Sequence, residues 1–152
     1  MSRSDGFNGA RDDAPGTHPS RMLALAVGVV YTLIGVAGFF VTGLDNFASE
    51  TDETLLGFEI NPLHNIVHLA IGVLGLVMSR RLSSARAFGW ILAIAYGGAF
   101  LYGLVAVNNP DINFLSLNSA DQWLHLLSAA LGLAIALWPV RSTAASRANP
   151  AR

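Results

Sequence analysis

NPLHNIVHL, residues 61–69, begins an apolar segment and decides how the rest of the chain is interpreted. A related stretch, NSADQWLHL at residues 118–126, begins another apolar segment 57 positions later. Asn61 suits the N-cap of a helix and Pro62 its first position, and Asn118 suits the N-cap of a second helix. The two stretches therefore predict two helices with matching starts, each carrying ionisable side chains in its first turns.

The composition of the chain is that of a membrane protein. Of its 152 residues, 53% are hydrophobic and 12% are charged, whereas soluble domains are about one quarter charged. Apolar segments at about 22–44, 62–79, 87–107 and 120–139 each approach the roughly 20 helical residues that cross a bilayer. We therefore expect an all-α, integral membrane four-helix bundle over residues 21–140. Residues 1–20 and 141–152 are polar and are expected to be disordered cytoplasmic tails.

The distribution of arginine sets the expected orientation, because the chain contains no lysine. Every arginine precedes the first apolar segment, lies between the second and third, or follows the fourth. The other two connections are acidic; their residues, with the adjoining positions, include Asp45, Glu50, Asp52, Glu53, Glu59 and Asp111. The positive-inside rule then places both termini and the 80–86 connection in the cytoplasm.

The chain is expected to contain two copies of one helical hairpin. His68 and His125 lie 57 positions apart, as do Gly75 and Gly132. The arginine and tyrosine at 21 and 31 correspond to those at 86 and 96. This pattern predicts two parallel-repeat helical hairpins, related by an axis along the membrane normal. Convergence on similar helix caps and helix composition is the alternative.

Small residues continue the faces on which the ionisable side chains lie. They are Gly72 and Gly75 on the second helix and Ser128 and Gly132 on the fourth. Small side chains allow membrane helices to approach closely, and polar ones face the interior of a bundle. We therefore expect the second and fourth helices to meet along the pseudo-two-fold axis.

Four ionisable side chains form the candidate site: His64, His68, Asp121 and His125. The members of each helix are four residues apart and share a face. A metal site made from all four would suit Zn²⁺ or Cu²⁺, and His68 and His125 alone could hold a b-type haem. His18 lies in the N-terminal tail and is expected to join neither site.

A hydrogen-bond network without any bound group is the third interpretation of the same cluster. Its expected partners are Asn65, Gln122, Tyr31, Tyr96 and Tyr102. Such a network would fix the register of the helices, and we therefore expect a non-enzymatic structural or interaction module with this polar cluster near the outer leaflet. A metal- or haem-binding redox or transport component is the alternative function.

Other chemistry is not indicated by the sequence. The absence of cysteine excludes disulfides, thiolate ligands and cysteine nucleophiles. We find no phosphate-binding glycine loop, no serine elbow, no HExxH motif and no basic patch suited to nucleic acid. The expected partner is the lipid bilayer, with a second copy of the chain or another membrane protein as further candidates.

The paired motifs NPLHNIVHLAIGVLGL (61–76) and LNSADQWLHLLSAALGL (117–133) lie on the second and fourth expected helices. They resemble those of a bacterial family of small four-helix membrane proteins, domain of unknown function 4383. The resemblance covers about residues 20–140. It implies the fold and a location in the bacterial plasma (inner) membrane, and it assigns no catalytic role to any residue.

Overall fold

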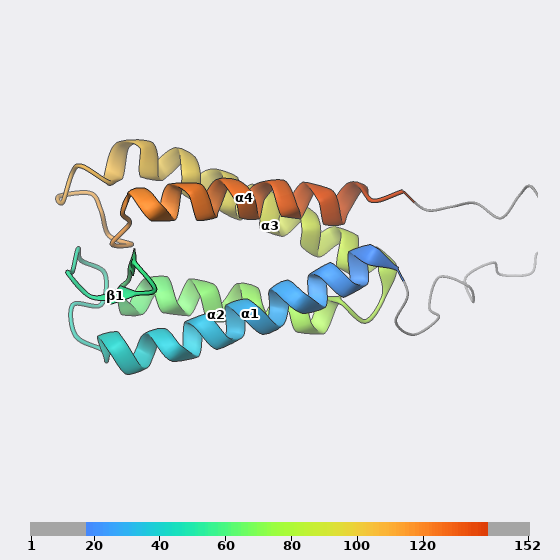
Figure 1. Ribbon diagram of the computed structural model, residues 1–152, viewed down its shortest axis with the longest axis horizontal. Coiled ribbons are helices and arrows are strands. Elements are labelled where there is room, and N and C mark those ends of the chain that lie inside the picture. The colour runs from blue at the N-terminus through green and yellow to red at the C-terminus, as the bar shows by residue number, and fades with distance from the viewer. Residues whose placement is uncertain (1–17, 140–152) are drawn as a thin grey trace, which may run out of the picture.

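Four α-helices pack as a bundle in the computed structural model, which describes residues 18–139 (Figure 1). The helices are α1 (Pro19–Thr42), α2 (Pro62–Met78), α3 (Leu82–Ala106) and α4 (Ser119–Leu137). A two-stranded antiparallel hairpin, β1 (Thr54–Leu55) and β2 (Phe58–Glu59), lies between α1 and α2. The all-α bundle is therefore confirmed. The tails expected at 1–20 and 141–152 lie outside the described residues, apart from residues 18–20.

Two helices begin earlier than the hydropathy pattern indicates. α1 begins at Pro19 because Nδ1 of His18 accepts a hydrogen bond from the backbone N–H of Ser20, at 3.2 Å. Residues 18–20 thus belong to the start of a helix and not to a tail. α3 begins at Leu82 rather than near 87, and Arg86 extends its side chain to the carbonyl oxygen of Ala136 (Nε–O 2.7 Å). A long arginine side chain can carry its charge to the membrane surface. An apolar helix can therefore include Arg86 and begin before it.

The closest backbone approaches lie between α1 and α2 and between α3 and α4. A Cβ atom on Gly75 would lie 2.8 Å from the Cα of Gly28, and one on Gly132 would lie 2.7 Å from the carbonyl oxygen of Gly89. Among the described helices, α2 and α4 are the pair whose backbones do not come into contact. The expected seam between the second and fourth helices is therefore wrong. Small residues permit close approach, but the partner is set by the small residues of α1 and α3.

The other two residues expected in that seam also contact α1. A Cβ atom on Gly72 would collide with Thr32. The hydroxyl groups of Ser128 and Tyr31 share a hydrogen bond, with 2.5 Å between the oxygens. Ser128 therefore joins the two hairpins through a hydrogen bond rather than through close packing.

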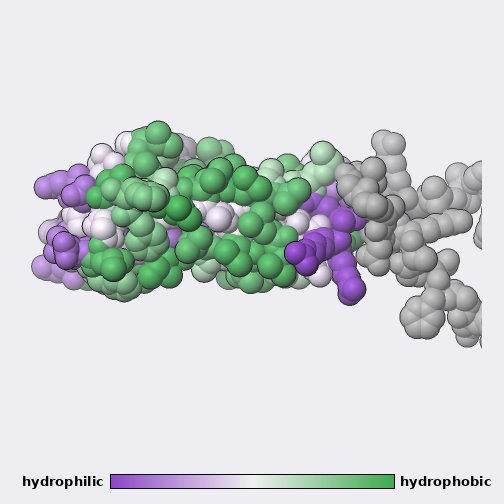
Figure 2. All heavy atoms as spheres, turned by 90° about the horizontal axis from the view of Figure 1, so that it is seen from below, coloured by the Kyte–Doolittle hydropathy of each residue, from purple (hydrophilic) through white to green (hydrophobic). Residues whose placement is uncertain are grey.

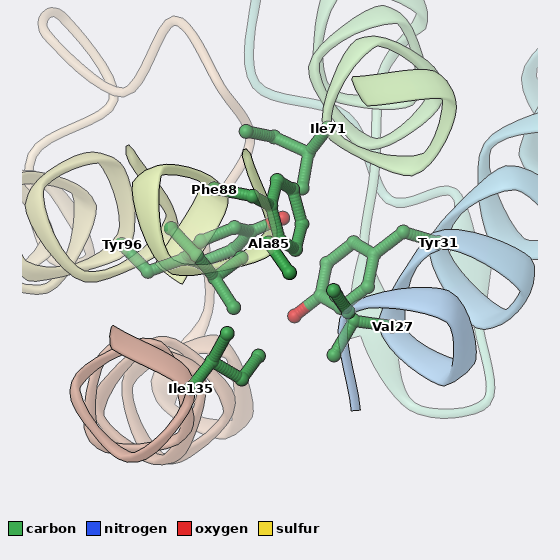
Figure 3. Close-up of a cluster of buried hydrophobic side chains, with 9 residues drawn as sticks. Val27, Tyr31, Ile71, Ala85, Phe88, Tyr96 and Ile135 are labelled. Atoms are coloured by element: carbon green, nitrogen blue, oxygen red, sulfur yellow. The ribbon is translucent and has the colours of Figure 1, made fainter. Parts of the chain in front are cut away.

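A cluster of buried apolar side chains from all four helices fills the bundle between its arginine end and the polar site (Figure 3). Val27, Ile71 and Ile135 lie in this cluster, and Phe88 and Leu92 at its centre are fully buried. Burial of apolar surface stabilises the bundle, and the cluster separates the buried histidines and Asp121 from the arginine end.

Large apolar side chains also cover the outside of the bundle, where they form a band between polar ends (Figure 2). Leu33, Ile94 and Leu127, from three different helices, are 63%, 72% and 65% exposed. α1, α3 and α4 are long and apolar enough to cross a membrane, whereas α2, with 17 residues, is shorter. This surface belongs to a membrane protein, because a soluble domain rarely exposes so wide an apolar patch.

The connections 43–61 and 107–118, which we call the cap, are hydrogen-bonded to each other over one end of the bundle. Nδ2 of Asn61 donates to the carbonyl oxygen of Phe114 at 2.8 Å, and Nδ2 of Asn118 donates to that of Gly57 at 3.0 Å. The buried apolar side chains of the cap are Ile60 and Leu117. The cap therefore covers the end at which α2 and α4 begin.

Candidate functional site

Two N-capping asparagines set the positions of the candidate site residues. Asn61 accepts a hydrogen bond from the backbone N–H of His64 through its Oδ1, at 2.9 Å. Asn118 and Asp121 form a capping box, in which Asp121 Oδ2 accepts from the N–H of Asn118 at 2.8 Å. Reciprocal bonds of this kind fix the first turn of a helix, so His64 and Asp121 lie at matching depths beneath the cap.

Three of the four predicted site residues come together across α2 and α4. Potential ligand atoms of His64, Asp121 and His125, one from each residue, all lie within 4.8 Å of one another. All three side chains are buried, with exposed fractions of 3%, 0% and 2%. The backbones of α2 and α4 stay apart, and these long polar side chains fill the space between them.

His68 is placed differently from the other three. Its ring centroid lies 4.5 Å from that of His64, and its edge faces Tyr31 with 5.2 Å between centroids. Tyr96 lies beside His125, with 5.4 Å between the ring centroids and the ring planes tilted at 54°. Each of the deeper histidines therefore packs against a tyrosine of the neighbouring helix in its own hairpin.

Other polar residues expected in the network lie elsewhere. Nδ2 of Asn65 donates to the hydroxyl of Thr42 at 3.0 Å, on the side of α1. The side chain of Gln122 lies against Gly103 of α3. The hydroxyl of Tyr102 donates to the carbonyl oxygen of Ile112 in the cap. The cluster is thus smaller than the sequence predicts.

Several atoms of the cluster have no hydrogen-bond partner among residues 18–139. They are Nδ1 of His64, both ring nitrogens of His68, Oδ1 of Asp121 and Nδ1 of His125. Leaving a buried polar atom unpaired costs about 1–3 kcal/mol. Native proteins usually satisfy such atoms with water, an ion or a ligand. The side chains therefore do not form the self-satisfied network that is one interpretation of the sequence.

A small cavity adjoins these unpaired atoms. Its volume is about 30 Å³, and its polar lining consists of His64, His68, Tyr96 and His125. Leu115 of the cap also lines it. Roughly 10–15 Å³ is enough for one water molecule, whereas cofactor pockets have hundreds of Å³. The cavity suits a water molecule or a metal ion, and its volume is far below that of a porphyrin pocket.

A sequence profile of the family described as "Domain of unknown function (DUF4383)" matches residues 21–138. The chain belongs to this family. The match confirms the resemblance carried by the paired motifs, and it includes all four candidate site residues. No curated protein and no solved structure gave a significant match to this DUF4383 chain.

The cap of the DUF4383 domain carries one carboxyl group with a perturbed pKa. Burial raises the pKa of Glu59 above its ordinary value of 4.5, and the charges of Glu50 and Asp52 raise it further. A hydrogen bond from Asn118 opposes this shift. Glu59 thus connects the acidic surface of the cap to the N-cap of α4, a position that the sequence pattern alone does not single out.

Proposed function

We propose that this DUF4383 protein binds one transition-metal ion, Zn²⁺ or Cu²⁺, through His64, Asp121 and His125. The observation that carries the proposal is the convergence of three buried ligand side chains within 4.8 Å, several of whose polar atoms are unpaired. Two imidazoles and a carboxylate are ligands that Zn²⁺ and Cu²⁺ both accept. No further chemistry is required of the site, and we assign it no enzymatic activity.

The ligand geometry requires a small contraction on binding. A tetrahedral zinc site holds its ligand atoms about 3.4 Å apart, as follows from metal–ligand bonds of about 2.0–2.1 Å. Rotations of the three side chains bring their atoms from within 4.8 Å to that spacing. The fourth position is then open to water or to His68, which lines the same cavity as His64 and His125.

The membrane placement follows from the helix contacts and the arginines. α2 packs along α1, so we propose that it crosses the bilayer with the three longer helices. The arginines of the described residues lie at one end of the bundle and the acidic cap at the other, and hydrophilic residues gather at both ends (Figure 2). By the positive-inside rule, the cap faces the outside of a bacterial inner membrane and both termini face the cytoplasm. The metal site then lies in the outer half of the bilayer.

We also propose that the two hairpins arose by duplication, which the paired contacts support. Nε of Arg21 donates to the carbonyl oxygen of Ser79 at 3.0 Å, and Nε of Arg86 donates to that of Ala136 at 2.7 Å. The donors are 65 positions apart and the acceptors 57. Two equivalent residues that make equivalent contacts are expected of two copies of one unit.

The contacts across the cap favour a two-fold relation between these copies. Asn61 donates to Phe114, and its counterpart Asn118 donates to Gly57, which is the counterpart of Phe114 at the same offset of 57. Such reciprocity, in which residue i contacts j and j contacts i, is the mark of an isologous two-fold interface. The proposed metal site therefore lies between the copies, where each contributes ligands.

A second candidate function is a structural module whose polar cluster binds only water. The volume of the cavity, about 30 Å³, fits this alternative as well as it fits a metal ion, because it accommodates one or two water molecules. In that case the histidines and Asp121 fix the register of the helices through water-mediated bonds, and added metal has no effect on stability.

Thermal unfolding in detergent separates the two functions. An ion that binds only the folded state stabilises it by about 2.7 kcal/mol at a free concentration 100 times its Kd. Zn²⁺ or Cu²⁺ should raise the Tm of the wild type and of His18→Ala. His18 is the N-cap of α1 and lies at the arginine end of the bundle, away from the proposed site. His125→Ala should lose the increase. An equal increase in all three proteins would contradict the proposal, and no increase in any would favour the structural module.

A further inference from the structure

A groove opens on the outer face of α1 at the arginine end of the bundle. Its volume is about 700 Å³, within the range of ligand pockets. Its floor consists of five apolar residues of α1, which are Met22, Leu25, Ala26, Val29 and Val30. They extend over nine residues, or about 12 Å of helix from the first to the last. The groove therefore offers an apolar track that follows the direction of an acyl chain in the bilayer.

The head of this groove is basic. Arg21, Ser79 and Arg80 line it together. Nε of Arg21 donates to the carbonyl oxygen of Ser79 at 3.0 Å, which holds this guanidinium against the end of α2. Arg80 follows directly and is exposed. Two positive charges at the water–lipid boundary, next to an apolar track, are complementary to an anionic phosphate group with an attached acyl chain.

The other hairpin lacks this arrangement. Arg86 donates to Ala136 as Arg21 does to Ser79, but the residue after Ala136 is Leu137, where the first hairpin has Arg80. Within residues 18–139, the second hairpin thus has the same arginine contact without an arginine at the position equivalent to Arg80. This difference shows that the pair of charges is not a general consequence of the helix packing.

We infer that the groove headed by Arg21 and Arg80 binds one anionic phospholipid, with its phosphate at the arginines and an acyl chain along Met22–Val30. The inference is independent of the metal site, which lies at the opposite end of the bundle. Charge selects the headgroup, because basic pockets on the cytoplasmic side of membrane helices retain anionic lipids. The groove selects a lipid over a free anion, because the apolar track gains only from an acyl chain.

Native mass spectrometry of the purified full-length protein, titrated with phosphatidylglycerol or phosphatidylcholine, tests the inference. One phosphatidylglycerol should bind in preference to phosphatidylcholine. Arg80→Leu, which copies the residue at 137, should weaken this binding about fivefold, the value of one basic residue near an anionic headgroup. Arg81→Leu is the matched control. It removes the same charge at the next position along the chain, which does not line the groove.

Two further arms separate the track from the charge. Ala26→Trp fills the groove without altering charge and should weaken phosphatidylglycerol binding. Millimolar inorganic phosphate should not displace the lipid, and displacement would show that the arginines hold a free anion only. Equal losses in Arg80→Leu and Arg81→Leu, or equal binding of the two lipids by the wild type, would overturn the inference.

Discussion

Tyr31 and Tyr96 meet in the centre of the bundle, with their ring centroids 5.2 Å apart and their planes at 66°. Each comes from the first helix of its hairpin, and each packs against a histidine of the second helix, His68 or His125. The tyrosine pair thus separates the polar site from the apolar core. It also joins the hairpins, because Tyr31 is hydrogen-bonded to Ser128 of the other one.

Loss of the Tyr31 hydroxyl should destabilise the bundle. Tyr31→Phe removes one partner of a buried hydrogen bond and leaves the Ser128 hydroxyl unpaired, at a cost of about 1–3 kcal/mol. Ser128→Ala should cost a similar amount, and the double variant should cost clearly less than the sum. Chemical unfolding in mixed micelles measures all three. Strict additivity would show that the two hydroxyl groups do not interact.

Glycines of the α1–α2 and α3–α4 seams should not tolerate large side chains. Gly75→Leu would place Cβ 2.8 Å from the Cα of Gly28, and overpacking of this kind costs about 1–3 kcal/mol or more. Gly132→Leu should be destabilising in the same way, because its side chain would collide with α3. Val73→Leu, at a position that is 47% exposed on the outside of the bundle, is the control and should be nearly silent. The free energy of unfolding is the readout, and equal tolerance at 73 and 75 would refute these seams.

Stability should depend on pH through Glu59. Since its pKa is raised above 4.5 in the folded protein, the folded state binds this proton more tightly than the unfolded state does. The contribution of Glu59 to stability is therefore largest in acid and is lost as the pH rises through the raised pKa. Glu59→Gln should raise Tm at neutral pH and flatten its decline above pH 4.5, whereas Glu53→Gln, an exposed neighbour in the cap, should not. A Glu59→Gln profile parallel to that of the wild type would contradict this assignment.

Topology reporters test the proposed orientation. A cytoplasmic reporter should be active when fused after residue 147 or within 80–86. A periplasmic reporter should be active only within 45–58 or 108–116, both of which lie in the cap. A periplasmic reporter that works at the C-terminus would rule out four crossings with both termini inside.

The sequence predicts the local features of this protein well. Asn61 and Pro62 mark the start of α2 because capping depends on a few consecutive residues. His64 and Asp121 lie at the same depth because each is three residues after its N-cap asparagine. The family membership also follows from the two local motifs.

Relations between helices could not be predicted in the same way. Gly75 was expected to face α4, yet it packs on Gly28, because a small residue permits contact with any neighbour that is also small. One interpretation of the sequence makes His68 a fourth metal ligand, and in the structure its ring packs against Tyr31. The matching small residues on α1 were visible in the sequence, and pairing Gly28 with Gly75 would have identified the correct seam.

The metal content of the purified protein tests the proposed site at His64, Asp121 and His125. After loading with Zn²⁺ or Cu²⁺ and removal of free ions, elemental analysis should find one ion per wild-type or His18→Ala chain. His125→Ala and Asp121→Asn should retain none, because each lacks one of three ligands. His68→Ala should still bind one ion, about tenfold more weakly, as expected for a residue beside the ligands. Equal metal content in the wild type and in folded His125→Ala would contradict the proposed site.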